Sequence, residues 1–291
     1  MVRQLITIVG AFLLASPTDA QTYRDAVARL AGVSADLTFP SEASELSFFS
    51  RLQMAIYKPA GEGPFPAVVI LPGCGGLRPE ILDWAKKVVA GGYVAFVVDP
   101  VTSRGQPVCV PASPSNHYRG TKDAFQALAH LRRFAFVDQE RVGLLGFSWG
   151  AMVGLLASSQ TFADLFSLCL RYVAAVGFYP LCHVDPMQGR PAVDFVRPDH
   201  DRPALILMGD QDVEAPAADC LSLLKAQAEK GQKVEWHVYP DATHCWDCSS
   251  MDNYSKTDFR GVRVTYKYNK ELTQDSTKRV FEYLGARLKR P

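Results

Sequence analysis

Ser148 has the surroundings of a nucleophile. It lies at the centre of the run GFSWG at residues 146–150, between an apolar stretch typical of a buried strand, 141–147, and a helical pattern of small and apolar residues, 149–159. In that context the two glycines allow a tight strand-to-helix turn that exposes the serine hydroxyl. The helix N-terminus behind it offers N–H groups and a positive dipole end to a developing oxyanion. The spacing predicts a nucleophilic serine, with an ordinary glycine-rich turn as the alternative.

A serine hydroxyl attacks efficiently only when a neighbouring base accepts its proton. His244 is the best placed of the six histidines, because it ends the loop 240–244 directly after the last predicted strand. His183 and His200 lie in the excursion that follows residue 179, and they are alternatives without further support. The other three lie in predicted helices or strands: His117, His130 and His237. The sequence therefore predicts His244 as the base.

An imidazole base needs an acid that fixes its tautomer and stabilises its charged form. Asp212 follows the glycine that ends the predicted strand 204–208 by three residues and precedes a helix that starts at a proline. Asp210 lies nearer the strand end and is the main competitor, whereas Glu214 is more simply explained as a solvated carboxylate or a helix cap. Ser148, Asp212 and His244 follow one another in the chain order nucleophile, acid, base, which is the order found in hydrolases whose nucleophile lies on such a strand-to-helix turn.

Two backbone N–H groups are expected to stabilise negative charge on an attacked carbonyl oxygen. One belongs to Trp149, the residue directly after the nucleophile. The second is expected in the loop PGCGG at residues 72–76, where glycines let the backbone approach a substrate closely. We predict the N–H of Cys74 as this second donor, with Gly73 and Gly75 as the neighbouring alternatives.

The elements that must position these residues are short apolar strands that alternate with helices. Residues 46–57 are predicted to form an extended strand or a hairpin. Further strands are predicted at 67–71, 93–98, 141–147, 172–179, 204–208 and 234–239, and helices at 79–90, 116–134, 149–159, 217–230 and 271–288. This alternation is typical of a parallel sheet with helices on both faces. Functional groups of such a sheet lie just past the carboxyl ends of its strands. The sequence therefore predicts one α/β domain, mostly parallel, at residues 45–291.

Composition and charge exclude several classes of protein. The 291 residues include 48% hydrophobic and 21% charged residues, which is enough apolar sequence for a sizeable core and argues against disorder. The chain has 31 Lys and Arg residues and 30 Asp and Glu residues, so it has almost no net positive charge. Nucleic-acid binding is therefore not expected as its main function. The sequence contains no run of 18 or more apolar residues, so it predicts no membrane-spanning helix.

The first twenty residues have the three-part layout of a secretory signal peptide. Arg3 gives a positive start, residues 5–15 form a short apolar run, and Ala20 ends a polar stretch with a small residue. We predict cleavage after about Ala20, an N-terminal extension at 21–44, and a secreted or periplasmic protein. A buried N-terminal helix is the alternative.

Seven cysteines are a generous supply, and in an oxidising compartment several of them are expected to pair. Cys182 follows one strand end and Cys220 lies in the helix after the neighbouring strand, so we predict a disulfide between them. Cys74 with Cys109 is a weaker pair, and Cys169 is the predicted free thiol. Residues 245–248 have redox spacing, but they occur in a loop and do not open a helix after a strand, which argues against a thioredoxin-like role. The alternative is that most cysteines are reduced and buried.

The chain resembles the exported branch of the dienelactone hydrolase family, within the α/β-hydrolase fold, over about residues 45–288. The runs that carry the resemblance are LPGCGG at 71–76, GFSWG at 146–150, YPLC at 179–182, GDQD at 209–212 and YPDATH at 239–244. The resemblance implies hydrolysis of a carboxylic ester or lactone through Ser148, His244 and Asp212, without a cofactor or metal. Two positions depart from it: the family's nucleophile is a cysteine, and its usual His-Gly before the oxyanion loop is Pro72-Gly73 here.

Our leading interpretation is a secreted or periplasmic serine hydrolase whose partner is a small-molecule ester or lactone. The alternatives are an acyltransferase or small-peptide hydrolase of the same fold, or a non-catalytic binding protein. Arg104, Tyr179 and Trp246 are candidates for substrate contacts. Trp149 must direct its indole either into the site or down beside the sheet, and the first direction would favour short acyl groups.

Overall fold

The computed structural model describes residues 36–45, 52–101, 103, 114–167, 170–185, 192–258 and 260–289. The chain divides into two compact units, Met1–Val33 and Ser34–Pro291, and every described residue belongs to the second. The predicted signal peptide at 1–20 therefore lies outside the described residues. Within the described part, no helix has both the length and the apolar character needed to cross a membrane.

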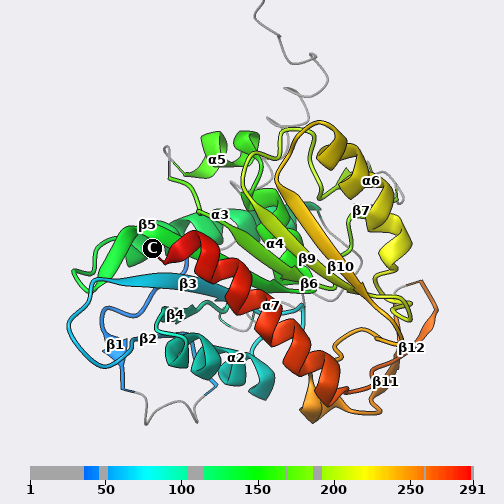
Figure 1. Ribbon diagram of the computed structural model, residues 1–291, viewed down its shortest axis with the longest axis horizontal. Coiled ribbons are helices and arrows are strands. Elements are labelled where there is room, and N and C mark those ends of the chain that lie inside the picture. Colours follow the sequence, from blue (N-terminus) through cyan, green and yellow to red (C-terminus); the bar gives the residue numbers. More distant parts are fainter. Residues whose placement is uncertain are drawn as a thin grey trace, which may run out of the picture. The chain divides into compact units, whose positions relative to one another are not determined.

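An eight-stranded sheet forms the centre of the domain (Figure 1). In spatial order its strands are β1 (Ala43–Ser44), β2 (Ala55–Tyr57), β4 (Val94–Val97), β3 (Phe65–Leu71), β5 (Val137–Phe147), β6 (Ala175–Phe178), β9 (Ala204–Gly209) and β10 (Val234–Tyr239). All neighbours pair in parallel except β2 and β4, which are antiparallel. The prediction of a single α/β domain with a mostly parallel sheet is confirmed.

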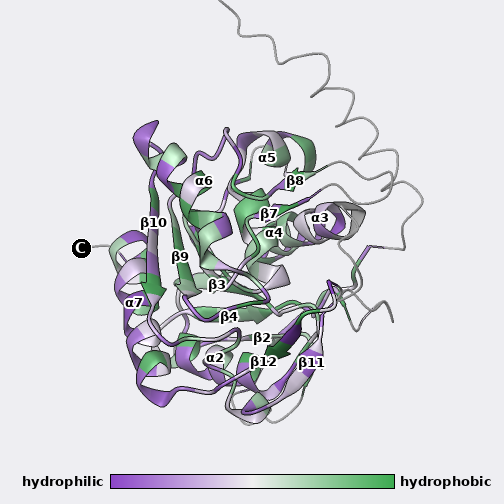
Figure 2. Cartoon of the chain, turned by 90° about the vertical axis from the view of Figure 1, so that its right-hand side faces the viewer, coloured by the Kyte–Doolittle hydropathy of each residue, from purple (hydrophilic) through white to green (hydrophobic). Residues whose placement is uncertain are grey.

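Helices cover both faces of this sheet, as its doubly apolar strands require. On one face α2 (Pro79–Ala90) and α7 (Lys270–Leu288) pack against the strands. On the other face lie α3 (Pro114–Leu131), α4 (Trp149–Ala157) and α6 (Ala217–Glu229), and α5 (Gln160–Phe166) follows α4. Figure 2 shows the hydrophobic strands between helices with hydrophilic outer sides. The core is thus two apolar layers, one on each side of the sheet.

The predicted elements agree with the structure where the apolar pattern is strong. The helix predicted at 79–90 and the strand predicted at 234–239 have the observed bounds. Strand β5 begins at Val137, four residues before the predicted start, because Val137 pairs with Phe65. The polar residues that follow Val137 interrupt the apolar pattern, which is why the sequence placed the start later.

The N-terminal boundary predicted at residue 45 is too late. β1 pairs with β2 and so extends the sheet into the predicted N-terminal extension. Asp36 in the same segment forms ion pairs with Arg119 and Lys122 of α3. A two-residue strand carries too little pattern to be recognised in a sequence.

Short elements between the main strands and helices were also missed. After β10 the chain forms a 3-10 turn, η3 (Ser249–Met251), and an antiparallel hairpin of β11 (Ser255–Thr257) and β12 (Arg263–Thr265). A second small hairpin joins β7 (His183–Val184) and β8 (Val193–Asp194). The first hairpin matters for the site, because it brings Lys256 and Tyr266 next to the predicted base.

Candidate active site

Ser148 occupies a strained turn between β5 and α4. Its backbone has φ 49° and ψ −111°, and its N–H donates a hydrogen bond to the carbonyl of Phe178 in β6. The two flanking positions must be glycine because backbone atoms leave no room for a side chain there. A Cβ on Gly146 would lie 2.2 Å from the carbonyl oxygen of Gly150, and a Cβ on Gly150 would lie 2.4 Å from the carbonyl oxygen of Leu71. The turn therefore presents a partly exposed serine at the carboxyl edge of the sheet.

Of the three residues predicted to act together, His244 lies within hydrogen-bond distance of both Ser148 and Asp212. His244 Nε2 lies 3.1 Å from Ser148 Oγ, and His244 Nδ1 lies 2.7 Å from Asp212 Oδ2. The other oxygen of Asp212 accepts hydrogen bonds from the backbone N–H groups of Glu214 and Ala215, at 2.9 and 2.8 Å. This geometry fixes the carboxylate, which in turn orients the imidazole toward the serine.

The charges around His244 favour its protonated form. Burial disfavours the imidazolium, but the carboxylates of Asp212 and Glu214 outweigh burial and raise the pKa of His244. Glu214 is itself held by Lys256 Nζ at 2.7 Å and by the hydroxyl of Tyr266, which donates to it at 2.7 Å. Two acids therefore stabilise positive charge on a histidine that is only 4% exposed.

Aromatic rings enclose the imidazole. The ring centroid of Tyr179 lies 4.5 Å from that of His244, and the centroid of Tyr266 lies 5.5 Å away. Tyr179 has φ 41°, and its hydroxyl donates a hydrogen bond of 2.9 Å to Asp247. Asp247 also accepts from Trp84 Nε1 at 2.8 Å, and burial raises the pKa of its carboxyl. Tyr179, predicted as a substrate contact, is only 2% exposed, and the hydrogen bond to Asp247 fixes its ring.

The remaining predicted site residues have different positions. Trp246 is 0% exposed in the core, packed against Phe178 and Tyr239, so it is not accessible for the substrate contact expected of it. The indole of Trp149 takes the direction beside the sheet: it is 4% exposed, and a Cβ on Gly120 of α3 would lie 2.5 Å from it. Arg104 lies outside the described residues.

The expected oxyanion loop lies against the serine. A Cβ on Gly73 would be 3.6 Å from Ser148 Cβ, which places the residue before Cys74 in contact with the nucleophile. Trp149 is the first residue of α4, so its N–H belongs to the unpaired first turn of that helix. Trp149 therefore adjoins Ser148 in the chain, and the loop that contains Cys74 contacts it through Gly73.

The competing residues lie elsewhere. Asp210 is exposed, and its backbone N–H donates to the carbonyl of Tyr239. His183 pairs with Asp194 across the β7–β8 hairpin at 2.6 Å. His200 is fully buried beside Ser159, past the end of α4.

Two disulfides lie within the described residues. Cys182 and Cys220 are joined with Cα atoms 4.9 Å apart, which is the pair the sequence predicted. Cys245 and Cys248, treated above only as a redox-like spacing, are also joined. Cys74 takes part in a disulfide as well, whereas Cys109 and Cys169 lie outside the described residues.

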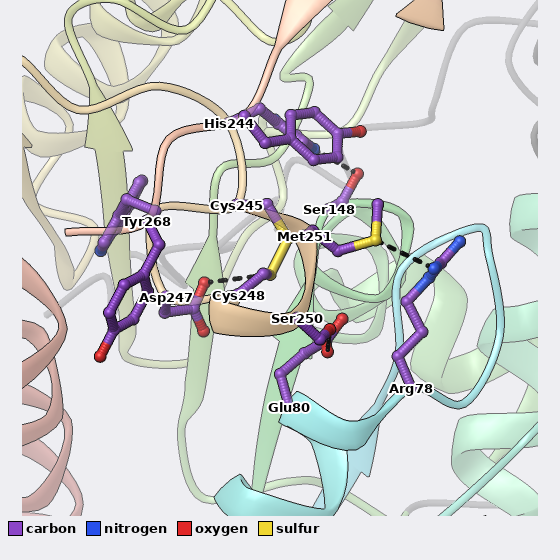
Figure 3. Close-up of a disulfide and its surroundings, with 12 residues drawn as sticks. Arg78, Glu80, Ser148, His244, Cys245, Asp247, Cys248, Ser250, Met251 and Tyr268 are labelled. Atoms are coloured by element: carbon purple, nitrogen blue, oxygen red, sulfur yellow. Dashed lines mark hydrogen bonds between the residues drawn. A yellow bond between two sulfur atoms is a disulfide. The ribbon is translucent and has the colours of Figure 1, made fainter. Parts of the chain in front are cut away.

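One cluster of potential metal ligands occurs among the described residues. It consists of Glu80, Cys245 and Cys248, whose ligand atoms lie within 4.8 Å of one another. Because the two sulfurs are bonded to each other, they are not free to coordinate a metal in this state. The cluster lies beside the serine site (Figure 3).

Sequence reasoning missed Lys256, Tyr266 and the role of Glu214. Glu214 follows Asp212 by two residues in the same loop. Nothing in this position distinguishes it from an ordinary solvated carboxylate. Lys256 lies in β11, where no apolar pattern marks a strand, and Tyr266 directly follows β12. Residues 262–268, VRVTYKY, do alternate between apolar and polar residues, which is a strand signal that could have revealed this segment. No local signal in the sequence places these three side chains around His244.

An elbow serine at the carboxyl edge of a mostly parallel sheet, with an acid and a histidine on later loops, defines an α/β hydrolase. The chain belongs to the dienelactone hydrolase family, whose sequence profile matches residues 52–288. The resemblance to this family stated from the sequence is thereby confirmed, and the protein is a carboxylic ester hydrolase.

Individual relatives agree with this membership. A protein of Salmonella typhimurium strain LT2, provisionally named a carboxymethylenebutenolidase, is 25% identical over 235 residues, which cover 76% of this chain and 81% of the relative. The fold matches that of a provisionally named dienelactone hydrolase of Klebsiella pneumoniae with a TM-score of 0.59 and 20% sequence identity. The match covers 80% of this chain and 92% of the other. The fold also matches Thermogutta terrifontis esterase 2 at 0.56, with 18% identity and coverage of 79% and 87%.

Proposed function

We propose that this protein is an exported serine hydrolase that cleaves a carboxylic ester or lactone through Ser148, His244 and Asp212. The observation that carries the proposal is the continuous chain of contacts from Ser148 Oγ through His244 to Asp212, with distances of 3.1 and 2.7 Å. A serine hydroxyl, an imidazole and a buried carboxylate in this arrangement are the parts of a nucleophilic triad.

The proposed reaction has two halves. His244 Nε2 accepts the proton of Ser148 Oγ while the oxygen attacks the carbonyl carbon, and the imidazolium is stabilised by Asp212. The N–H groups of Trp149 and Cys74 stabilise the oxyanion that forms. The imidazolium then protonates the leaving alkoxide, which leaves an acyl group on Ser148. Water, deprotonated by His244, attacks this acyl-enzyme and releases the acid.

The substrate class is an ester or lactone small enough to reach the partly exposed serine. The relative named as a carboxymethylenebutenolidase supports a lactone, and the structural neighbour that was solved phosphorylated by paraoxon supports an ester-type electrophile. The indole of Trp149 lies between α3 and α4 and not over the serine, so a preference for short acyl groups no longer follows from that residue.

Export is part of the proposal. The charged start, apolar run and small residue at position 20 support a cleaved signal peptide, and the disulfides support an oxidising compartment. Fractionation of a bacterial culture that expresses the full chain should recover protein outside the cytoplasm with an N-terminus at about Gln21. Cytoplasmic protein that retains Met1 would contradict export without touching the catalytic proposal.

Reaction with paraoxon tests the serine directly. The wild-type protein should hydrolyse p-nitrophenyl acetate, lose this activity on treatment with paraoxon, and carry the added phosphoryl group on Ser148 by peptide mass spectrometry. Ser148→Ala should be neither active nor modified, with an unchanged melting temperature. Ser222→Ala, on the exposed side of α6, is the matched control and should behave as wild type. Activity retained by Ser148→Ala would overturn the proposal.

A further inference from the structure

The disulfide between Cys245 and Cys248 closes a four-residue turn directly after His244 (Figure 3). The N–H of Cys248 donates to the carbonyl of Cys245 at 3.0 Å within the same turn. Cys245 has φ 59°, a left-handed conformation that residues with a side chain adopt only at a cost. The disulfide therefore closes the turn in which Cys245, the residue next to the base, has this unfavourable backbone conformation.

The disulfide and the imidazole share a packing partner. Tyr179 Oη lies 3.8 Å from the sulfur of Cys245 and 3.8 Å from that of Cys248, while the Tyr179 ring packs on His244 at 4.5 Å. The same hydroxyl donates to the buried Asp247, which lies between the two cysteines in sequence. A movement of the sulfurs is therefore transmitted to the ring that supports the base.

The two cysteines differ in exposure. Cys245 is partly exposed beside the serine, whereas Cys248 is 1% exposed. By contrast, both cysteines of the other described disulfide, Cys182 and Cys220, are 0% exposed. Thiol–disulfide exchange requires that an attacking thiolate reach one sulfur. A small reductant therefore meets Cys245 before it meets the disulfide between Cys182 and Cys220.

We propose that the disulfide between Cys245 and Cys248 is a thiol–disulfide exchange site, open to small thiols and dithiols, whose oxidised state positions His244 for catalysis. The proposal rests on the hydrolase function proposed above. It makes Cys245 and Cys248 positioning residues, because their sulfurs act through the backbone and Tyr179 and take no part in the ester chemistry.

The exchange balances with a dithiol as the reductant. One thiolate of the dithiol attacks Cys245 Sγ, the bond between the two protein sulfurs breaks, and Cys248 leaves as a thiolate. The Cys248 thiolate takes up the proton that the attacking thiol of the reductant released to solvent. The second thiol of the reductant then displaces Cys245, which releases the cyclic disulfide of the reductant and a second protein thiol.

Opening the bond should change the rate and not the fold. The turn keeps its hydrogen bond, and Trp246 within it remains buried in the core. Cys245 is freed to leave its left-handed conformation, so His244 loses part of its alignment with Ser148. We expect kcat to fall about tenfold, equivalent to about 1.4 kcal/mol of transition-state free energy, with KM unchanged.

The experiment compares oxidised, reduced and reoxidised protein. Wild type is treated briefly with dithiothreitol, its free thiols are alkylated and mapped, and p-nitrophenyl acetate turnover is measured on a matched sample. Cys245→Ala/Cys248→Ala should have the low kcat from the start and should not respond to the reductant. Cys182→Ala/Cys220→Ala is the matched control and should respond as wild type does. Reoxidation of wild type should restore kcat.

Several results would overturn the proposal. One is an unchanged kcat in wild type whose Cys245 and Cys248 have been mapped as free thiols. Another is a persistent response in Cys245→Ala/Cys248→Ala, which would assign the effect to a different disulfide, either that of Cys74 or that between Cys182 and Cys220. Oxidised wild type without any ester turnover would reject the proposed function instead. The exchange site would then stand only if reduction shifts the NMR resonances of the His244 imidazole, and it would fall if they do not move.

Discussion

At the scale of single residues, two aspartates separated by one position have opposite surroundings. Asp212 is 3% exposed and binds His244 Nδ1, whereas Asp210 is exposed to solvent. We expect Asp212→Asn to lower kcat about 10⁴-fold, because the amide disrupts the tautomer and the charge stabilisation of the imidazole. Asp210→Asn should stay within about twofold of wild type, since it removes a solvated charge. Steady-state ester hydrolysis measures both, and a larger loss in Asp210→Asn would refute the assignment of the acid.

The pH dependence of hydrolysis should report His244. The imidazole accepts a proton only when neutral, so kcat/KM should rise with pH through its pKa, which Asp212 and Glu214 hold above the ordinary value. Glu214→Gln removes one of these carboxylates and should move the midpoint of the profile to lower pH. Glu140→Gln, an exposed carboxylate in β5, is the control and should leave the midpoint in place. A midpoint that rises in Glu214→Gln would contradict the proposed electrostatics.

At the scale of elements, the elbow depends on the contact between α4 and the end of β3. A Cβ on Gly150 would lie 2.4 Å from the carbonyl oxygen of Leu71 and 2.7 Å from that of Pro72, both of them backbone atoms. Gly150→Ala should therefore cost about 3 kcal/mol of unfolding free energy, the upper end of overpacking costs, and should displace Ser148. Thermal denaturation and ester turnover measure the two effects.

Gly285→Ala in α7 provides the matched control. Its new Cβ would lie 3.9 Å from Tyr93 Oη, an ordinary contact, and alanine favours a helix over glycine by about 0.5–1 kcal/mol. This variant should be as stable as wild type or more so, with full activity. Equal effects of the two substitutions would show that the elbow has no special steric requirement.

At the scale of the whole molecule, the disulfide between Cys182 and Cys220 ties the segment after β6 to α6 across 38 residues of sequence. Loop closure of that length restricts the unfolded chain by about 4 kcal/mol in the entropic model. We expect Cys182→Ala/Cys220→Ala to lose about 2–4 kcal/mol of unfolding free energy in urea titrations while it keeps ester turnover. An unchanged unfolding midpoint would mean that the native state gains nothing from this bond.

The sequence by itself determined the elements and the chain order of the candidate site. Apolar strands followed by helices specify a parallel sheet, because burial on both faces leaves a periodicity that is visible locally. The glycines around Ser148 mark the elbow for the same reason, since the backbone contacts that exclude a side chain arise within one turn. Asp212 and His244 could be selected because parallel strands bring their carboxyl ends to one edge.

Only the tertiary structure decided what surrounds those three residues. The bond between Trp84 and Asp247 joins positions 163 residues apart, and that between Tyr266 and Glu214 joins positions 52 apart. The indoles of Trp149 and Trp246 are buried in the core. Composition and spacing do not determine whether such a side chain points into the core or toward the active site. Contacts of this kind depend on how separate elements pack together, and the residue pattern of one segment does not determine which distant residues it will contact.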